Sequence, residues 1–491
     1  MSSNLTIEQR LEQLQKAKER AQPQPPKGAK IQRVAHHLRD RKHFTKHYEP
    51  KLISLGPIHH GAEKLQLGEQ CKQRWAATYI ESTGKTPQTL HKRVVDDFEN
   101  QKKLFDDDLL LASTQQYQKQ GFTTMEEKIQ WMLFVDACAL LQILEHANLH
   151  APEKMKIKVD QLVLVMGDVL LLENQLPFSL LKLLWKNDES ELMKTMKKFL
   201  RCHHWATKKE DMIIETEFPE PNHLLDLQRS IILYDPNKGK QTQNNDNQNQ
   251  DTNKGNEAQN DPNINMANMG NPTPNENPVQ SWTIINNIIR RCLPKTKRKN
   301  QNENNDDMVT YRNIKELKEA GIVLKSSKTR RPRDVSFSYG WIRSELKLPE
   351  IVVDDTTAAT VLNLIAYEMC PDFENDYGIC SYVSFLDSLI DHPDDVKALR
   401  SEQILLNSLG SDEEVANLFN TISTDLVPDM VKYADVRNEI EKHYSDKSRT
   451  WLALGYHTYF SNPWAIIAFH AAVVGLALTF VQTWYTIHPP K

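Results

Sequence analysis

The C-terminal end of the chain holds a run of 21 residues, from Trp464 to Trp484, without a charged side chain. As an α-helix this run is about 31 Å long, which matches the hydrocarbon core of a bilayer. Tryptophans at both ends suit the membrane interface, so the sequence predicts one transmembrane helix over 464–485. The residues that we expect to anchor it are Trp464, Ile466, Phe469, Val473, Leu476, Phe480 and Trp484. A buried core helix is the alternative, which His470 favours.

One face of this predicted helix carries small side chains. They are Ala468, Ala471, Ala472, Gly475 and Thr479. Such faces let two transmembrane helices approach closely, so the stripe suggests a homo-oligomer. An alanine-rich helix also produces such a face by chance, and both interpretations stay open at this point.

The position of the apolar run predicts a topology. Few residues follow it, and the first 30 residues contain no apolar stretch of the kind found in secretory signals. We therefore expect a tail-anchored, single-pass protein with its body in the cytosol. The plasma membrane and the endoplasmic reticulum are the two membranes that we favour.

Composition narrows the classes of partner. The 491 residues include 61 lysines and arginines against 65 acidic residues, so no nucleic-acid partner is expected. Six scattered cysteines without a CxxC spacing fit a reducing compartment. Hydrophobic residues make up only 39% of the chain, which indicates that some stretches build no core.

Those stretches define the predicted organisation. Residues 1–30 read as a charged helix or arm, 31–236 as the first part of a helical body, and 311–460 as its second part. Between the two parts, 237–310 is rich in asparagine and is expected to be disordered, apart from a short amphipathic basic helix. The basic residues of that helix could contact anionic lipid, and they are Arg290, Arg291, Lys295, Lys297, Arg298 and Lys299.

Apolar periodicity predicts a mainly α fold with a few short strands. Helical spacing on nearly every face marks 126–149 and 159–185 as buried helices. In the second part, helices are expected over 356–369, 380–391 and 413–422, and strands over 335–341 and 351–353.

Three consecutive polar residues, Glu173, Asn174 and Gln175, stand between leucines and just before Pro177. Because buried polar groups are normally hydrogen-bonded, we expect them to bind backbone at a helix junction. The alternative is a ligand-binding or catalytic carboxylate.

The chain shows no catalytic or cofactor motif. Gly84-Lys85-Thr86 lacks the earlier glycine of a phosphate loop, and no hydrolase, dinucleotide or zincin pattern occurs. The pairs His36-His37, His59-His60 and His203-His204, the last beside Cys202, are poor zinc ligands because adjacent histidines rarely share one tetrahedral ion. We therefore expect no metal, no cofactor and no enzyme activity.

Several segments together resemble the plant-specific family known as domain of unknown function 247. They include Ser54-Leu-Gly-Pro-Ile-His-His-Gly61, Asp168 through Phe178, Asn363-Leu-Ile-Ala-Tyr-Glu368 and Asn462-Pro-Trp464. The resemblance implies a membrane-associated plant protein without established enzyme activity, some of whose relatives are linked to pollen self-incompatibility in grasses. The chain departs from the family pattern at Ala35, at Met369-Cys370 and in its asparagine-rich insertion.

These observations favour an interaction protein: a helical body on a membrane that recognises another protein. An uncharacterised hydrolase or transferase is the first alternative, and it requires Glu173, Glu368 or a histidine to converge in one pocket. An adaptor that binds anionic lipid through Arg290 to Lys299 is the second.

Overall fold

The computed structural model describes residues 6–20, 31–41, 44–106, 109–110, 120–201, 216–235, 312–340, 344–373, 376–424, 426–445 and 463–488. Within them the fold is mainly helical with a few short strands, as the sequence predicts. The described residues of 6–235 and of 312–488 belong to one compact unit. The basic residues Arg290 to Lys299 lie outside the described residues, as does the rest of the asparagine-rich insertion.

The first part of the body is built from helices around α8 (Met125–His146), which is the predicted 126–149 helix. Thr124 caps its N-terminus, because its side chain accepts a hydrogen bond from the N–H of Glu127. The helices around it are α4 (Gln66–Ser82), α5 (Pro87–Asp96), α6 (Phe98–Lys102), α11 (Glu189–Leu200) and α13 (Leu224–Ile232). The short turn η1 (Glu63–Leu65) precedes α4, and the short turn η3 (Pro152–Met155) follows α8.

The second apolar run of this part does not continue as one helix. It divides into α9 (Val159–Asp168), the turn η4 (Leu172–Asn174) and α10 (Phe178–Leu184), with a bend of 102°. Pro177 is the N-cap of α10, so the proline sets the break that the sequence predicted. The bend places three polar side chains inside the body.

The second part mixes helices with two small sheets. Strands β1 (Ile322–Ser326), β3 (Ser344–Leu348) and β2 (Ser336–Ser338) lie in that order, with β1 parallel and β2 antiparallel to β3. Strand β4 (Ile351–Val353) pairs in parallel with β5 (Leu405–Asn407). Its helices are α16 (Ile314–Glu319), α17 (Thr357–Glu368), α18 (Gly378–Leu389), α19 (Pro393–Ser401), α20 (Asp412–Ile422) and α21 (Ala434–Ser445), with the turn η5 (Pro332–Asp334).

The sequence predicted β4, α17, α18 and α20 to within two residues at each end. The predicted strand over 335–341 is shorter, because only Ser336–Ser338 pair with β3. Strands β1, β3 and β5 were not predicted.

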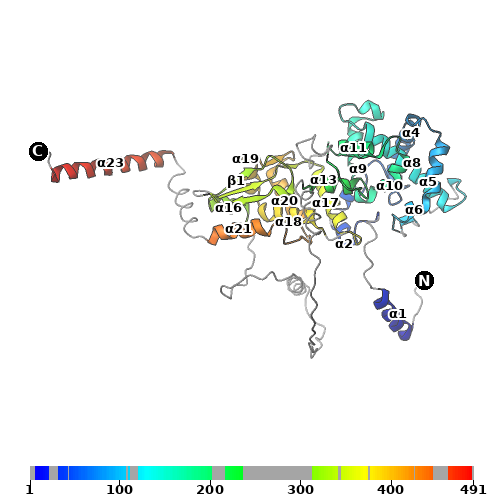
Figure 1. Cartoon of the computed structure of the whole chain (residues 1–491), viewed down its shortest axis with the longest axis horizontal. Helices are drawn as coiled ribbons and strands as arrows, with labels where there is room; N and C mark the ends of the chain where they lie inside the picture. The colour runs from blue at the N-terminus through cyan, green and yellow to red at the C-terminus, as the bar shows by residue number, and fades with distance from the viewer. Residues whose placement is uncertain are drawn as a thin grey trace, which may run out of the picture. The chain divides into compact units, whose positions relative to one another are not determined.

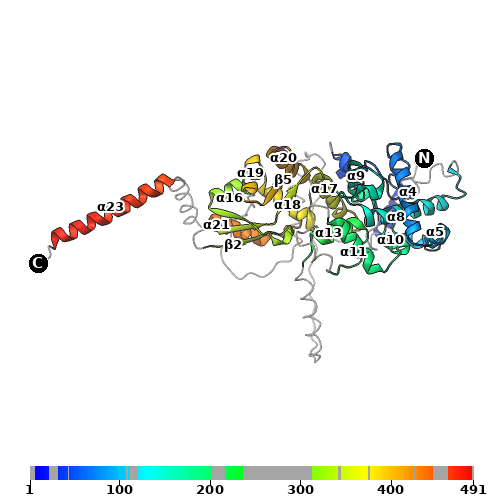
Figure 2. The same cartoon turned by 90° about the horizontal axis from the view of Figure 1, so that it is seen from above.

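Two apolar cores hold the body together, one in each part. An N-terminal segment crosses between them: Val34, Leu38, Phe44 and Tyr48 are buried in the second core, although they precede the first in sequence. Leu38 lies on the short helix α2 (His36–Arg39) and Tyr48 on the short helix α3 (Thr45–Tyr48). Figures 1 and 2 show α4, α5 and α8 at one end of the body and α16 and α21 at the other. Segment 31–61 therefore connects both cores.

Two further helices complete the described residues. The N-terminal arm is helical over α1 (Ile7–Arg20), and the side chain of Thr6, just before it, accepts from the N–H of Gln9. α23 (Pro463–Ile487) is the 25-residue helix at the C-terminal end.

Candidate functional site

The loop 49–61 runs between the two cores without regular secondary structure, and side chains from elsewhere satisfy its backbone. Asp168, at the end of α9, accepts three hydrogen bonds from the N–H groups of Lys51, Leu52 and Ile53 at 2.9, 2.7 and 2.9 Å. Burial raises the pKa of Asp168, and the three N–H donors oppose that rise. This carboxylate therefore fixes the path of the loop.

The predicted backbone role of Asn174 and Gln175 is confirmed. Asn174 accepts from the N–H of Leu55 at 2.6 Å and donates to the carbonyl oxygens of Ile53 and Asp168. Gln175 donates to the carbonyl oxygens of residues 169 and 171 and accepts from the N–H of Leu225. Both side-chain amides are buried, and in each of them the NH2 group donates a hydrogen bond and the oxygen accepts one. Neither amide therefore leaves an unpaired polar group in the core.

A second group of buried contacts fixes the same loop. Lys72 on α4 donates to Asp136 on α8 at 2.6 Å and to the carbonyl oxygen of Ser54 at 2.7 Å. Asp136 also accepts from the N–H of Gly56 at 2.9 Å. Burial alone lowers the pKa of Lys72, but the charges of Asp136 and Glu69 outweigh it and raise the pKa overall. Burial raises the pKa of Asp136, and the charge and hydrogen bond of Lys72 oppose that rise, so each partner favours the charged form of the other.

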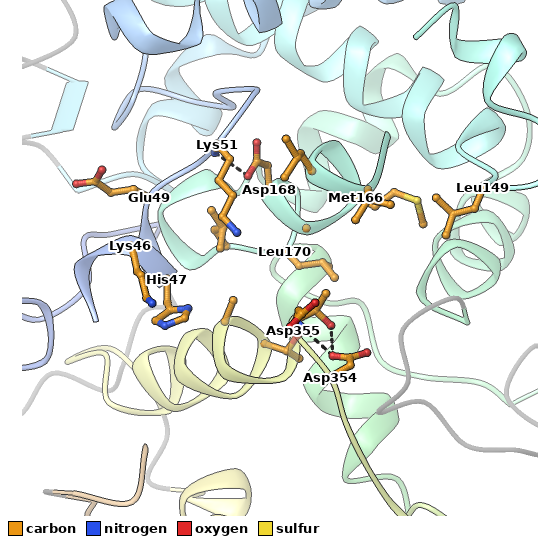
Figure 3. Close-up of a pocket in the computed structure, with 17 residues that line it drawn as sticks. Lys46, His47, Glu49, Lys51, Leu149, Met166, Asp168, Leu170, Asp354 and Asp355 are labelled. Atoms are coloured by element: carbon orange, nitrogen blue, oxygen red, sulfur yellow. Dashed lines mark hydrogen bonds between the residues drawn. The ribbon is translucent and has the colours of Figure 1, made fainter. Parts of the chain in front are cut away.

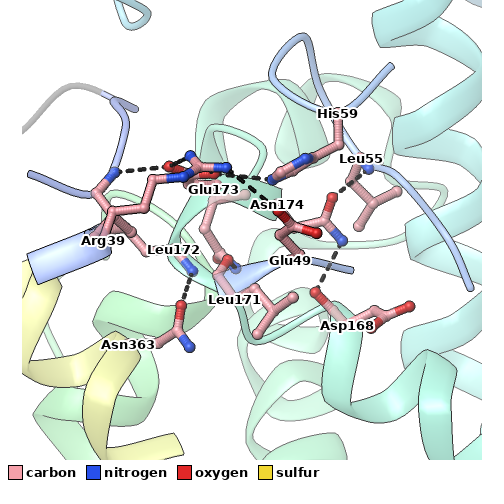
Figure 4. Close-up of polar contacts among 12 residues, drawn as sticks. Arg39, Glu49, Leu55, His59, Asp168, Leu171, Leu172, Glu173, Asn174 and Asn363 are labelled. Atoms are coloured by element: carbon pink, nitrogen blue, oxygen red, sulfur yellow. Dashed lines mark hydrogen bonds and ion pairs between the residues drawn. The ribbon is translucent and has the colours of Figure 1, made fainter. Parts of the chain in front are cut away.

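Glu173 is buried, and three groups surround its carboxylate (Figure 4). Arg39 donates to both carboxylate oxygens at 2.8 and 2.9 Å, the N–H of Val34 donates at 2.9 Å, and His59 Nε2 lies 3.0 Å from Oε2. Burial raises the pKa of Glu173, but the hydrogen bond with His59 and the charge of Arg39 bring it below its ordinary value. Glu173 is thus a stable carboxylate that joins α2, the loop and η4.

Two polar residues of the second part make similar contacts. Asn363 on α17 accepts from the N–H of Leu172 at 2.8 Å and donates to the carbonyl oxygen of His47 at 2.9 Å, so it joins the two parts. Glu368 accepts from Arg229 at 2.7 Å and from the N–H groups of residues 379 and 380. Glu173 and Glu368 thus have different partners, and neither carboxylate lines the pocket described next.

A pocket of about 480 Å³ opens where the two parts meet (Figure 3). One wall is apolar and comes from Leu149 and from α9 and its end, with Met166 and Leu170. The other wall comes from α3 and from the start of α17. Such a volume takes a small ligand or one large side chain of another protein.

Charges of both signs stand at the rim of the pocket. Lys46 and Lys51 are exposed on one side, and Asp355 is exposed on the other. The neighbouring Asp354, just before α17, accepts from the N–H of Thr356 at 2.9 Å. The pKa of His47 is lowered to about 4 by burial and by the nearby lysines, so His47 is neutral at physiological pH.

The predicted anchor residues lie on α23, and their apolar side chains are exposed except for that of Ile466, which lies outside the described side chains. The exposed fractions of Trp464, Phe469, Val473, Leu476, Phe480 and Trp484 range from 46% to 75%. Within the described residues, α23 is the one unbroken helix that is long and apolar enough to cross a membrane. The small residues from Ala468 to Thr479 are also exposed, and their pairing stays a prediction.

The histidine pairs separate into different environments. His36 contacts Asp40, whereas His59 contacts Glu173. His60 lies beside Asp136 and Lys72, where burial lowers its pKa. His203, His204 and Cys202 lie outside the described residues.

Sequence reasoning missed Lys72, Asp136 and the pocket. Asp136 did carry a signal, because it is a lone acid inside the apolar run of α8. Its partner could not be found in the same way, since Lys72 lies on another helix. The pocket residues come from four separate segments of the chain, which no local pattern connects.

The fold and the site define a mainly helical protein with a buried polar junction and one C-terminal helix of membrane-spanning length. The chain belongs to the family DUF247, described as plant protein of unknown function, which it matches over residues 31–478. The family predicted from the sequence is therefore confirmed.

Two curated relatives from Arabidopsis thaliana are similar to the chain. UPF0481 protein At3g47200 is 25% identical over 453 residues, which cover 89% of this chain and 82% of the relative. At3g02645, also named as a UPF0481 protein, is 27% identical over 175 residues, which cover 35% of this chain and 32% of the relative. No solved structure matches the chain significantly.

Proposed function

We propose that this chain is a membrane-anchored recognition protein whose body binds another protein through the pocket between its two parts. The observation that carries the proposal is α23, which exposes apolar side chains all around its circumference over 467–484. A helix of this kind needs an apolar environment on every side, and its length suits a bilayer.

The pocket supports the recognition role. It combines an apolar wall with exposed Lys46, Lys51 and Asp355, and this mixture is typical of sites that take an anchoring side chain and orient its neighbours by charge. Glu173 and Glu368, the carboxylates of the hydrolase alternative, already accept hydrogen bonds from arginine and backbone. The geometry therefore favours recognition over that chemistry.

Gly167 offers a direct test of the pocket. It lines the cavity, and a Cβ atom there meets nothing within 4 Å, so a larger side chain fills the cavity without strain at its base. We expect Gly167→Leu to lose the membrane-dependent partners that proximity labelling finds for the wild type in plant cells. Leu67→Met, an exposed change on α4, serves as the control. Retention of the same partners by Gly167→Leu would contradict the recognition role of the pocket.

The proposed topology places the body on the cytosolic face of the plasma membrane or the endoplasmic reticulum. It is tested by adding a glycosylation acceptor after Lys491 and comparing its modification with that of Asn4 in membrane extracts. Modification of the added acceptor alone supports a cytosolic body. Modification of Asn4 would place the body on the other side and contradict the tail-anchored arrangement.

For the cellular role, we extend the proposal to self-recognition of the pollen self-incompatibility type, which the family resemblance implies for some relatives. The matching experiment is deletion of the gene followed by scoring of self-pollen rejection. Unchanged rejection would remove this extension and leave the anchoring proposal standing.

A further inference from the structure

The loop 426–433, between α20 and α21, exposes three apolar side chains close together in sequence. The exposed fractions are 49% for Val427, 42% for Met430 and 63% for Val431. Single exposed apolar residues are common, but three within five positions form a local patch that water does not favour.

The loop is held firmly by the body beneath it. The N–H of Asp429 donates to the hydroxyl of Ser381 at 2.8 Å, and the hydroxyl of Tyr433 donates to the carbonyl oxygen of Pro332 at 3.2 Å. The ring of Tyr433 also stacks on Phe385 at 4.7 Å between centroids. The exposure of the apolar side chains is therefore set by ordered contacts on the inner side of the loop.

Loop 426–433 lies a short distance before α23 in the sequence. α21 begins directly after it at Ala434 and ends at Ser445. Only 17 residues, 446–462, separate Ser445 from Pro463 at the start of α23. They span at most about 60 Å, and α21 itself is about 18 Å long, so the loop lies within reach of any membrane that holds α23.

The charges around the loop argue against a strongly anionic partner surface. Lys432 forms an ion pair with Asp376, and Asp429 accepts from the N–H of Val431 at 3.0 Å. Charged groups of both signs thus lie beside the apolar side chains. This chemistry fits shallow insertion into an interface of zwitterionic lipid, which depends on apolar area rather than on net charge.

We propose that Val427, Met430 and Val431 insert into the interfacial layer of the same membrane that holds α23. The inference rests on the anchoring part of the proposed function. Three side chains alone bind a bilayer weakly, but the tether raises their effective concentration at the surface, so weak insertion is sufficient. The contact orients the body with loop 426–433 toward the membrane, whereas α5 lies at the other end of the body from α16 and α21 (Figures 1 and 2).

The test uses the full chain in phosphatidylcholine vesicles with an environment-sensitive fluorophore at one cysteine. The cysteines 71, 138, 370 and 380 are buried, and Cys202 and Cys292 are replaced by serine. Labels are placed through Met430→Cys on the loop, Val95→Cys on α5 and Phe469→Cys on α23. Val95 is the matched control, because its exposed fraction of 39% is close to that of Met430.

Brominated lipids then report the depth of each label. We expect bromines near the headgroups to quench the label at 430 most, bromines near the bilayer centre to quench the label at 469, and neither to quench the label at 95. Adding Val431→Asp should remove most of the quenching at 430 and leave that at 469 unchanged.

The outcomes separate the inference from the proposal on which it rests. If the label at 469 is quenched while the labels at 430 and 95 behave alike, the interfacial contact is wrong and the anchor stands. If the label at 430 is shielded from aqueous iodide but not quenched by lipid, another part of the protein covers the loop and the inference is overturned. If the label at 469 is not quenched, the anchor and the inference both fail.

Discussion

Loop 49–61 of the first part and the strands of the second part satisfy their backbone N–H groups by different means. In the second part, the ladders between β1, β3 and β2 and between β4 and β5 pair backbone with backbone. In the described residues of the first part, the one bridge is Ile31 with Phe105, and loop 49–61 depends on side chains. Asp168, Asn174 and Asp136 accept its N–H groups.

This difference has a consequence for stability. A ladder hydrogen bond survives most side-chain changes, because both partners belong to the backbone. A backbone group held by a side chain loses its partner as soon as that residue is replaced, and a buried donor is left unpaired. Point substitutions of polar residues should therefore be far more damaging in the first part than in the strands of the second.

The largest effect is expected for Asp168→Ala, which leaves three N–H donors of the loop without their acceptor. We expect the free energy of unfolding to fall by about 4 to 5 kcal/mol. Lys347→Ala, at an exposed position of β3, is the matched change in the second part and should cost less than about 0.5 kcal/mol. Urea unfolding of both variants measures the contrast, and equal losses would refute it.

The next effect concerns the buried pair of Lys72 and Asp136. Lys72→Met leaves the Asp136 carboxylate buried without its cation and should cost about 4 kcal/mol. Adding Asp136→Leu removes the isolated charge, so the double variant should recover about half of that loss, although the N–H of Gly56 stays unpaired. A double variant less stable than Lys72→Met would show that the charge is not the cause.

A pH effect tests a side-chain acceptor at a helix end. His223 is 1% exposed and caps α13, because its Nδ1 accepts from the N–H of Asp226 at 3.2 Å. Burial lowers its pKa to about 4. Since the folded state then binds fewer protons than the unfolded state, stability should fall as the pH drops from about 6.5 to about 4, by about 3 kcal/mol.

His223→Asn isolates that contribution, because asparagine keeps a capping oxygen and does not titrate. The variant should show a smaller loss of unfolding free energy between neutral and acidic pH than the wild type. Other buried histidines, such as His60, titrate in both proteins and cancel in the comparison. Identical pH profiles would rule out His223 as a source of acid sensitivity.

The smallest effects come from two glycines that differ in their surroundings. A Cβ atom at Gly68 on α4 would lie 1.9 Å from the carbonyl oxygen of Leu52, so the loop must shift. Gly68→Ala should cost about 2 kcal/mol. Gly167→Ala on α9 meets open space and should stabilise the fold by about 0.5 to 1 kcal/mol, because alanine favours the helix. Thermal unfolding distinguishes the two, and a shift of the same sign in both would contradict this explanation.

The sequence predicted the long helices and the polar turn well, for local reasons. α8 and α17 are long runs with apolar residues on nearly every face, and Pro177 marks the junction after three polar residues. The parallel pairing of β1 with β3 was missed, because five-residue strands carry weak local signals and find each other only across a turn and another strand. The contacts of Lys72 with Asp136 and of Asn363 with Leu172 were also missed, since their partners are 64 and 191 residues apart.

The sequence by itself determined the mainly helical class, the apolar C-terminal helix and the family, because periodicity, run length and motifs are local properties of the chain. Tertiary structure decided which carboxylate holds which backbone group, where the pocket opens and which apolar side chains stay exposed on loop 426–433. These features depend on surfaces that meet only after distant segments pack, and the free energy of burying or pairing a polar group is set at that step.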